Sequence, residues 1–197
     1  MTDRVMVFID YQNVHLSALS QFHPYGTHPA KGHVNPLKIG QELVLKRRYG
    51  GELAGVHVYR GSPVPDYQPG AAAANDRQAA VWTSHDLVTV HRRPLNYRGW
   101  PDQPPREKGI DVKLSIDFVR MALTGAYDVG ILFSRDTDLM PALEAVRDLT
   151  SVHVEVATWS GGYTSRLQYP GTNQPWCHYL NREFYDLVRD DRDYSLS

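Results

Sequence analysis

Aspartates at three points of the chain have the residue types and spacing for metal chemistry. Asp10 ends an apolar run in VMVFIDYQN, Asp111 lies in EKGIDVKL, and Asp136 and Asp138 lie in ILFSRDTD. An ionised carboxylate next to a core is costly unless something pairs with it. Clustered carboxylates also raise one another's pKa unless a cation lies between them. These aspartates form a metal site only if the fold brings them together.

Apolar runs rich in β-branched residues alternate with segments of helical spacing along the chain. Strands are predicted at 4–9, 53–59, 87–90, 129–133 and 152–158. Helices are predicted within 35–50, 69–85, 109–125, 139–149 and 181–190. This alternation predicts an α/β fold whose parallel sheet is covered on both faces. In such folds ligands bind beyond the carboxyl ends of the strands, where the strand order reverses.

The helix predicted around Asp111 places that residue close to the same edge. At about 100° per residue, the helix has two apolar arcs, and Asp111 falls between them on the side facing the sheet. The first arc is Val112, Ile116, Val119 and Leu123, and the second is Leu114, Phe118 and Met121. The remaining face carries Lys113, Asp117 and Arg120 and is predicted to be solvated. Asp117 is accordingly expected to be solvated or paired with one of those cations.

Helix capping is the alternative interpretation of these acids. Ser134, Asp136 or Asp138 can cap the helix that follows, and Asp111 can interact with a helix macrodipole. One cap explains one residue, whereas two acids bracket Thr137. For this cluster both interpretations stay open.

A hard cation with oxygen ligands would relieve the repulsion between these carboxylates. Mg²⁺ or Mn²⁺ held by Asp10, Asp111 and Asp136 is the natural choice. Such ions activate water and stabilise the leaving oxygen in phosphodiester cleavage. Asp138 is expected to extend the cage through a water or a second ion, and Asn13 to hold a water or a phosphate oxygen.

Three motifs, VFIDYQNVHLS, EKGIDVKLSIDFVRMA and ILFSRDTDLMPALEAV, follow one another in an order that resembles the NYN domain family, a branch of the PIN-like nucleases. The resemblance spans roughly residues 5–158. It implies a three-layer α/β/α sandwich with a mainly parallel central sheet and a metal-dependent ribonuclease activity. The family's functional residues then correspond to Asp10, Asn13, Asp111, Asp136 and Asp138. The family often has an acid at Asp117 as well, which makes that residue a candidate for supporting the ligands.

Arg135 departs from the family pattern, in which glycine is common at this position. Its side chain is expected either to contact a phosphate or to occlude the site or pair with an acid. The first outcome favours a metal-dependent endoribonuclease. The second favours a catalytically silent or gated RNA-binding module, and a phosphatase or nucleotide hydrolase is a third hypothesis.

Basic and aromatic residues before Asp111 are candidates for RNA contact. Arginines among aromatics can hold phosphates and stack bases. The predicted set is Arg92, Arg93, Tyr97, Arg98, Trp100, Arg106 and Lys108, together with Arg135. The alternative is a solvated loop whose aromatic rings pack on the surface. A second wall of the groove is predicted from Trp159, Tyr163, Arg166 and Tyr169.

The composition of the chain restricts its domain number, its partners and its cellular compartment. The chain has 197 residues, 42% of them hydrophobic and 22% charged, and predicts one domain over 1–190 with a flexible tail at 191–197. The net charge of −1 requires any RNA partner to be met by a local basic patch. Cys177 is the single cysteine, so no internal disulfide forms and a reducing, cytoplasmic compartment is expected. No membrane segment is predicted, and homo-oligomers are compatible with the sequence. His23, His28 and His33 are irregularly spaced, which favours an exposed loop over a zinc site.

Overall fold

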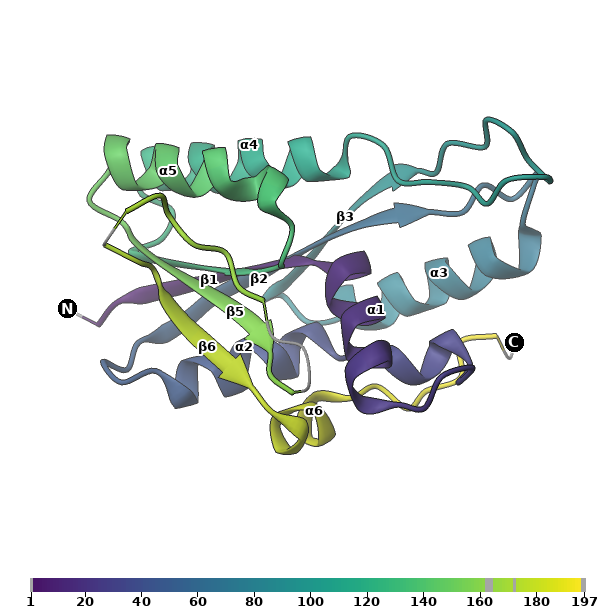
Figure 1. The fold of residues 1–197 in the computed structure, drawn as a ribbon, viewed down its shortest axis with the longest axis horizontal. Coiled ribbons are helices and arrows are strands. Elements are labelled where there is room, and N and C mark those ends of the chain that lie inside the picture. The colour runs from purple at the N-terminus through teal and green to yellow at the C-terminus, as the bar shows by residue number, and fades with distance from the viewer. Residues whose placement is uncertain (1, 162–164, 172, 196–197) are drawn as a thin grey trace.

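The computed structural model describes residues 2–161, 165–171 and 173–195. Figure 1 shows strands alternating with helices along most of the chain. The strands are β1 (Arg4–Asp10), β2 (Glu52–Ser62), β3 (Val88–Pro94), β4 (Val129–Phe133), β5 (His153–Trp159) and β6 (Trp176–Leu180). The helices are α1 (Tyr11–Phe22), α2 (Pro36–Lys46), α3 (Pro69–Thr83), α4 (Ile110–Leu123), α5 (Met140–Leu149) and α6 (Arg182–Val188). Two short 3₁₀ turns lie at Pro29–Gly32 and Thr137–Leu139.

The strands form one parallel sheet in the order β3-β2-β1-β4-β5-β6. From β1 the chain builds outward through β2 and β3, then returns to the other side of β1 to add β4, β5 and β6. The strand order therefore reverses between β1 and β4, which is where doubly wound sheets bind ligands. The five predicted strands are confirmed, whereas α1 and β6 were not predicted.

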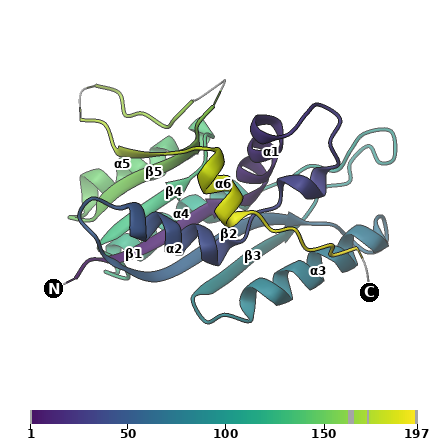
Figure 2. The ribbon, with the colours of Figure 1, turned by 90° about the horizontal axis from the view of Figure 1, so that it is seen from below.

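Helices cover both faces of the sheet, which confirms the three-layer α/β/α sandwich. One face carries α4 and α5, and the other carries α1, α2, α3 and α6 (Figures 1 and 2). Side chains of β1 alternate between the two cores: Val5, Val7 and Ile9 pack on the α2 side, and Met6 and Phe8 on the α4 side. Burial on both faces explains why the run from Val5 to Ile9 is continuously apolar.

The buried face of α4 differs from the prediction. Val112, Ile116 and Leu123, which form most of the first arc, are exposed, while Leu114 and Phe118 face the core. Asp117 is buried rather than solvated, at 1% exposure. The predicted pairing with cations is correct, because Lys113 Nζ lies 2.6 Å and Arg120 Nη2 3.3 Å from its carboxylate.

A hydrogen bond from the sheet completes the surroundings of Asp117. The Tyr59 hydroxyl donates to Asp117 at 3.1 Å. These partners outweigh burial and lower the pKa of Asp117, so the carboxylate stays charged inside the α4 face. We assign Asp117 to holding α4 on the sheet, at a distance from the acidic cluster described below.

The C-terminal residues pack on the α3 side of the sheet. Tyr194 is buried, and its hydroxyl donates to Asp190 at 2.6 Å. Arg77 Nε donates to the Tyr194 carbonyl at 2.8 Å. Residues 196 and 197 of the predicted flexible tail lie outside the described residues, and the single domain at 1–190 stays a prediction.

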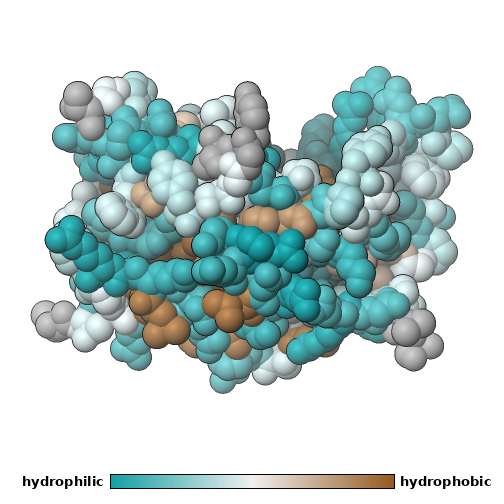
Figure 3. Space-filling view, turned by 60° about the horizontal axis from the view of Figure 1, so that its bottom comes forward, coloured by the Kyte–Doolittle hydropathy of each residue, from teal (hydrophilic) through white to brown (hydrophobic). Residues whose placement is uncertain are grey.

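The surface that carries α2 and α6 is largely hydrophilic, with small separate hydrophobic patches (Figure 3). Leu45 and Leu187 are among the exposed apolar residues of these two helices. None of the helices in the described part of the chain is long and apolar enough to span a lipid bilayer.

Candidate active site

The ends of β1 and β4 place two polar side chains next to each other. Ile9 pairs with Phe133, so the following residues, Asp10 and Ser134, are neighbours across the sheet. The Ser134 hydroxyl donates to Asp10 Oδ2 at 2.8 Å, and the Asn13 amide donates to Asp10 Oδ1 at 3.2 Å. Asp10 thus caps α1 as well as ending β1. Both donors, a hydroxyl and a backbone amide, are neutral, so they do not neutralise a charge on the buried Asp10 carboxylate.

Two further acids converge on Asp10. Asp111 lies in the first turn of α4, which begins after Gly109 in the left-handed conformation at φ 75°. Asp136 follows β4 by three residues. Carboxylate oxygens of Asp10, Asp111 and Asp136 all lie within 4.8 Å of one another. Residues distant in sequence therefore meet at the reversal point of the sheet.

The electrostatics of this cluster are unfavourable without a cation. Burial, together with the negative charges of Asp111 and Glu107, raises the pKa of Asp10 to about 7, although the hydrogen bonds from Ser134 and Asn13 oppose the rise. Burial and Asp136 also raise the pKa of Asp111. Three converging carboxylates, one of them buried, form the donor set that Mg²⁺ or Mn²⁺ prefers. The residues present therefore fit such a cation.

Asp138 lies outside this cluster. Its side chain is exposed, and its backbone amide donates to Asp136 Oδ1 at 2.9 Å. Asp136 therefore caps the 3₁₀ turn while its carboxylate also belongs to the acidic cluster. Asp136 thus fits both the helix-capping and the metal-site interpretation.

An open cavity of about 590 Å³ surrounds the acids. Its walls are Asp10, Gln12, Asn13, Leu16, Ser17, Ser20, Pro105, Arg106, Glu107, Asp111, Arg135 and Asp136. Asn13 was predicted to hold a water or a phosphate oxygen, but its Oδ1 accepts from the Arg135 amide at 3.2 Å. That hydrogen bond ties the start of α1 to the segment after β4.

The Arg135 side chain lines this cavity without a carboxylate partner in the described part of the chain. Its Nε is buried and has no hydrogen-bond partner among the described residues. A guanidinium with unused donors is suited to an anion such as a phosphate. The structure thus gives no support to pairing of Arg135 with an acid.

Sequence reasoning missed two residues of this site. Ser134 was a candidate helix cap, yet it bridges two acids, donating to Asp10 and accepting from the Asp136 amide at 3.0 Å. Glu107 was not predicted to belong to the site, yet it lines the cavity and accepts from the Gly61 amide. Burial raises its pKa, with a further contribution from Asp111. In the sequence, Glu107 could have been recognised by its position in EKGID, two residues before Gly109, the residue that precedes α4.

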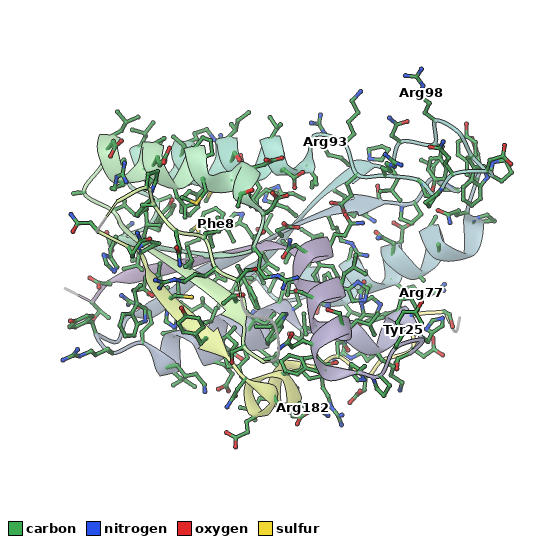
Figure 4. The ribbon with its side chains drawn as sticks, viewed as in Figure 1. Phe8, Tyr25, Arg77, Arg93, Arg98 and Arg182 are labelled. Carbon is green, nitrogen blue, oxygen red and sulfur yellow. The ribbon has the colours of Figure 1, made fainter. Side chains whose placement is uncertain are left out.

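Most of the predicted RNA-binding residues do not line the cavity. Tyr97 instead accepts from the Val64 amide at 3.1 Å, and its ring packs against Tyr67 and Trp100. These aromatic contacts match the surface-packing alternative. Arg93 and Arg98 point away from the sheet (Figure 4), and Lys108 is exposed. Of the predicted set, Arg135 and Arg106 are found in the described walls of the cavity.

The predicted second wall is wrong for Trp159, which lies in the core. Its indole N–H donates to the Val14 carbonyl at 2.9 Å, and its ring contacts Phe133. Tyr169 is also buried, under the Arg147 guanidinium. Arg166 lines a separate cavity beside β6, and Tyr163 lies outside the described residues.

Replacing Ser134 by alanine is expected to weaken Mn²⁺ binding about 10- to 100-fold, the usual cost of removing a group that orients a metal ligand. The hydroxyl fixes Asp10 Oδ2 and the Asp136 amide at once. Isothermal titration with Mn²⁺ measures this effect. Ser115→Ala on α4 is the matched control, because Ser115 is remote from these bonds, and equal affinities for both variants would contradict the assignment.

The chain belongs to the NYN domain family, whose model matches residues 4–172. The fold is similar to that of a protein of unknown function from Vibrio parahaemolyticus RIMD 2210633, known from its crystal structure. The TM-score is 0.51 at 16% identity, over 79% of this chain and 81% of the other. No functionally curated protein has significant similarity to the chain. The family match and the acidic cluster together define a PIN-like nuclease fold with a candidate metal site.

Proposed function

We propose that the protein is a divalent-metal-dependent endoribonuclease. The observation that carries the proposal is the convergence of Asp10, Asp111 and Asp136 within 4.8 Å in an NYN domain, at the edge where the strand order reverses. A structural protein would gain nothing from three converging carboxylates, which destabilise one another.

The site residues have distinct roles in this proposal. Asp10, Asp111 and Asp136 hold Mg²⁺ or Mn²⁺, which when bound supplies an activated water and stabilises the leaving oxygen of a phosphodiester. Ser134 keeps Asp10 oriented through its 2.8 Å hydrogen bond. Arg135 and Arg106 face the same cavity and bind the negatively charged backbone of RNA.

A gated RNA-binding module is the second candidate, and Arg135 is the observation that favours it. The Arg135 backbone is held by Asn13, so its side chain stays at the cavity wall. In an active nuclease, an RNA phosphate binds to this guanidinium and neutralises it. In a gated module, the guanidinium limits the access of RNA to the acidic cluster.

Cleavage of a labelled single-stranded RNA tests the proposal directly. With Mn²⁺ or Mg²⁺ we expect internal cuts that EDTA abolishes and that Asp10→Asn does not make. Asp66→Asn, at an exposed position remote from the cavity, is the matched control and should cut like the wild type. Absence of cleavage over a panel of RNAs with both metals would favour the module. Cleavage that survives Asp10→Asn would overturn the site.

A further inference from the structure

A second cavity adjoins the acidic one and shares three of its walls. It measures about 350 Å³, which falls in the range of about 300–1,000 Å³ typical of small-molecule sites. The shared residues are Gln12, Leu16 and Glu107. The cavity lies between α1 and α3, at the carboxyl end of β2, on the side of the sheet shown below it in Figure 1.

One stripe of α3 faces this cavity. Ala71, Ala74, Asn75 and Gln78 follow the helical spacing of three and four residues, and all four line it. Asn75 and Gln78 are buried at 5% and 2% exposure. Polar side chains on the buried stripe of a helix require partners, because unpaired buried amides are costly.

Of the two polar atoms in the Gln78 side chain, the oxygen is hydrogen-bonded and the nitrogen has no partner among the described residues. Its Oε1 accepts from Arg60 Nη1, which fixes the orientation of the amide. The Arg60 guanidinium is itself held over the rings of Tyr11 and Trp82, at 4.8 and 5.5 Å from their centroids. Gln78 Nε2 is buried and has no partner in the part of the chain that the structure describes. The cavity wall thus includes a residue with a fixed, unused hydrogen-bond donor.

Planar rings form much of the remaining wall. Tyr11, His15, His33 and Tyr194 line the cavity, and the His15 and His33 rings stack at 4.4 Å. Burial keeps His33 neutral by lowering its pKa to about 3. Arg60 and Glu107 are the charged residues of this wall, and the Arg60 guanidinium is already engaged by Gln78 and by the rings of Tyr11 and Trp82. The other walls are rings, apolar groups and amides, which suit a heteroaromatic ring better than a phosphate or a metal ion.

We propose that this cavity binds one nucleobase of the RNA whose phosphate lies at the acidic cluster, and that Gln78 Nε2 donates to a carbonyl of that base. The proposal rests on the proposed function for the identity of the chain that enters. The Gln78 oxygen already accepts from Arg60, so the group that Gln78 presents to a base is its N–H rather than the whole amide edge that pairs with adenine. Uracil offers two carbonyl acceptors to this N–H donor, whereas adenine accepts at ring nitrogens, and two of these lie beside its own amino donor, which would face Nε2. Uracil is therefore bound in preference to adenine.

Gln78→Glu tests the donor itself. The variant keeps an oxygen for Arg60 but presents a second oxygen, instead of an N–H, to the cavity. In a background of Asp136→Asn, which prevents cleavage, anisotropy with labelled oligo(U) and oligo(A) octamers measures binding. We expect about a 10-fold preference for oligo(U), the value of one hydrogen bond, and its loss in Gln78→Glu. Gln41→Glu, on the exposed face of α2, makes the same change of charge and should keep the preference.

A cavity-filling change gives an independent test that removes no polar group. Ala74→Leu places apolar bulk in the same space and should weaken oligo(U) binding while leaving oligo(A) nearly unchanged. This variant decides the question if Gln78→Glu does not fold. Equal effects on both octamers in both variants would overturn the base pocket.

The two proposals fail in different ways. Metal-dependent cleavage by the wild type without any base preference would overturn the pocket and leave the nuclease standing. A base preference that Gln78→Glu removes, in a protein that cuts no RNA, would support the pocket and overturn the nuclease. Neither cleavage nor discrimination between the octamers would overturn both.

Discussion

Replacing Asp136 by asparagine is expected to reduce metal-dependent RNA cleavage by more than about 100-fold, because removing a group that merely orients a ligand already costs about 10- to 100-fold. The substitution keeps an oxygen that can accept from the Asp138 amide, so the 3₁₀ turn is retained. The loss therefore reports on the acidic cluster and not on folding. Initial cleavage rates at saturating Mn²⁺ measure it, and circular dichroism verifies the fold.

Asp138→Asn is the matched variant two residues away. Asp138 is exposed and lies outside the cluster of three, so we expect less than a tenfold loss of the cleavage rate. The Mn²⁺-dependent rise in Tm should likewise disappear in Asp136→Asn and persist in Asp138→Asn. Equal losses in the two variants would show that the cage extends to Asp138, as the sequence motif suggested.

The second large effect concerns the stability of the metal-free protein. An unfolded aspartate ionises near pH 3.8, whereas Asp10 in the folded chain ionises at about 7. Between these values the folded state holds a proton that the unfolded state has released, so Asp10 makes stability fall as pH rises through this window. Above pH 7 the contribution is constant. At 1.36 kcal/mol per pH unit, its total is of order 4 kcal/mol.

Asp10→Asn removes this dependence and isolates it from other groups. Buried histidines act in the opposite direction, because His33 and His57 have pKa values lowered to about 3 and 4 and stabilise the fold as pH rises. The free energy of unfolding is therefore measured for both proteins in EDTA between pH 4 and 8, and the difference is taken at each pH. The free energy of unfolding of the variant should rise relative to that of the wild type up to pH 7. A difference that does not change with pH would contradict the burial of the Asp10 charge.

The sheet and the meeting of the three acids were accessible from the sequence for a physical reason. Runs such as VMVFI and VGILF are apolar at every position only when both faces of a strand are covered, which implies a parallel sheet with helices on each side. The carboxyl ends of parallel strands share one edge. Asp10 and Asp136 therefore had to lie at the same edge, and strand order decided that they are neighbours.

The side chains that required tertiary information were missed. A helical wheel shows two apolar arcs in α4 but not which of them meets the sheet. Asp117 is buried with Lys113 and Arg120 as cationic partners and a hydrogen bond from Tyr59, in β2, which no helical wheel shows. Glu107 lies outside any regular element, so no periodicity marked it. Gln78 is polar on a buried stripe, and its unused donor is visible only once Arg60 is known to occupy its oxygen.

The family model ends at residue 172, yet the packed molecule continues beyond it. β6 covers the outer edge of β5, Phe184 and Val188 of α6 lie in the core, and Tyr194 walls the second cavity. A chain shortened to the family boundary would expose the edge of β5, and uncovered strand edges promote aggregation. Recombinant protein should therefore keep the packed segment that follows residue 172.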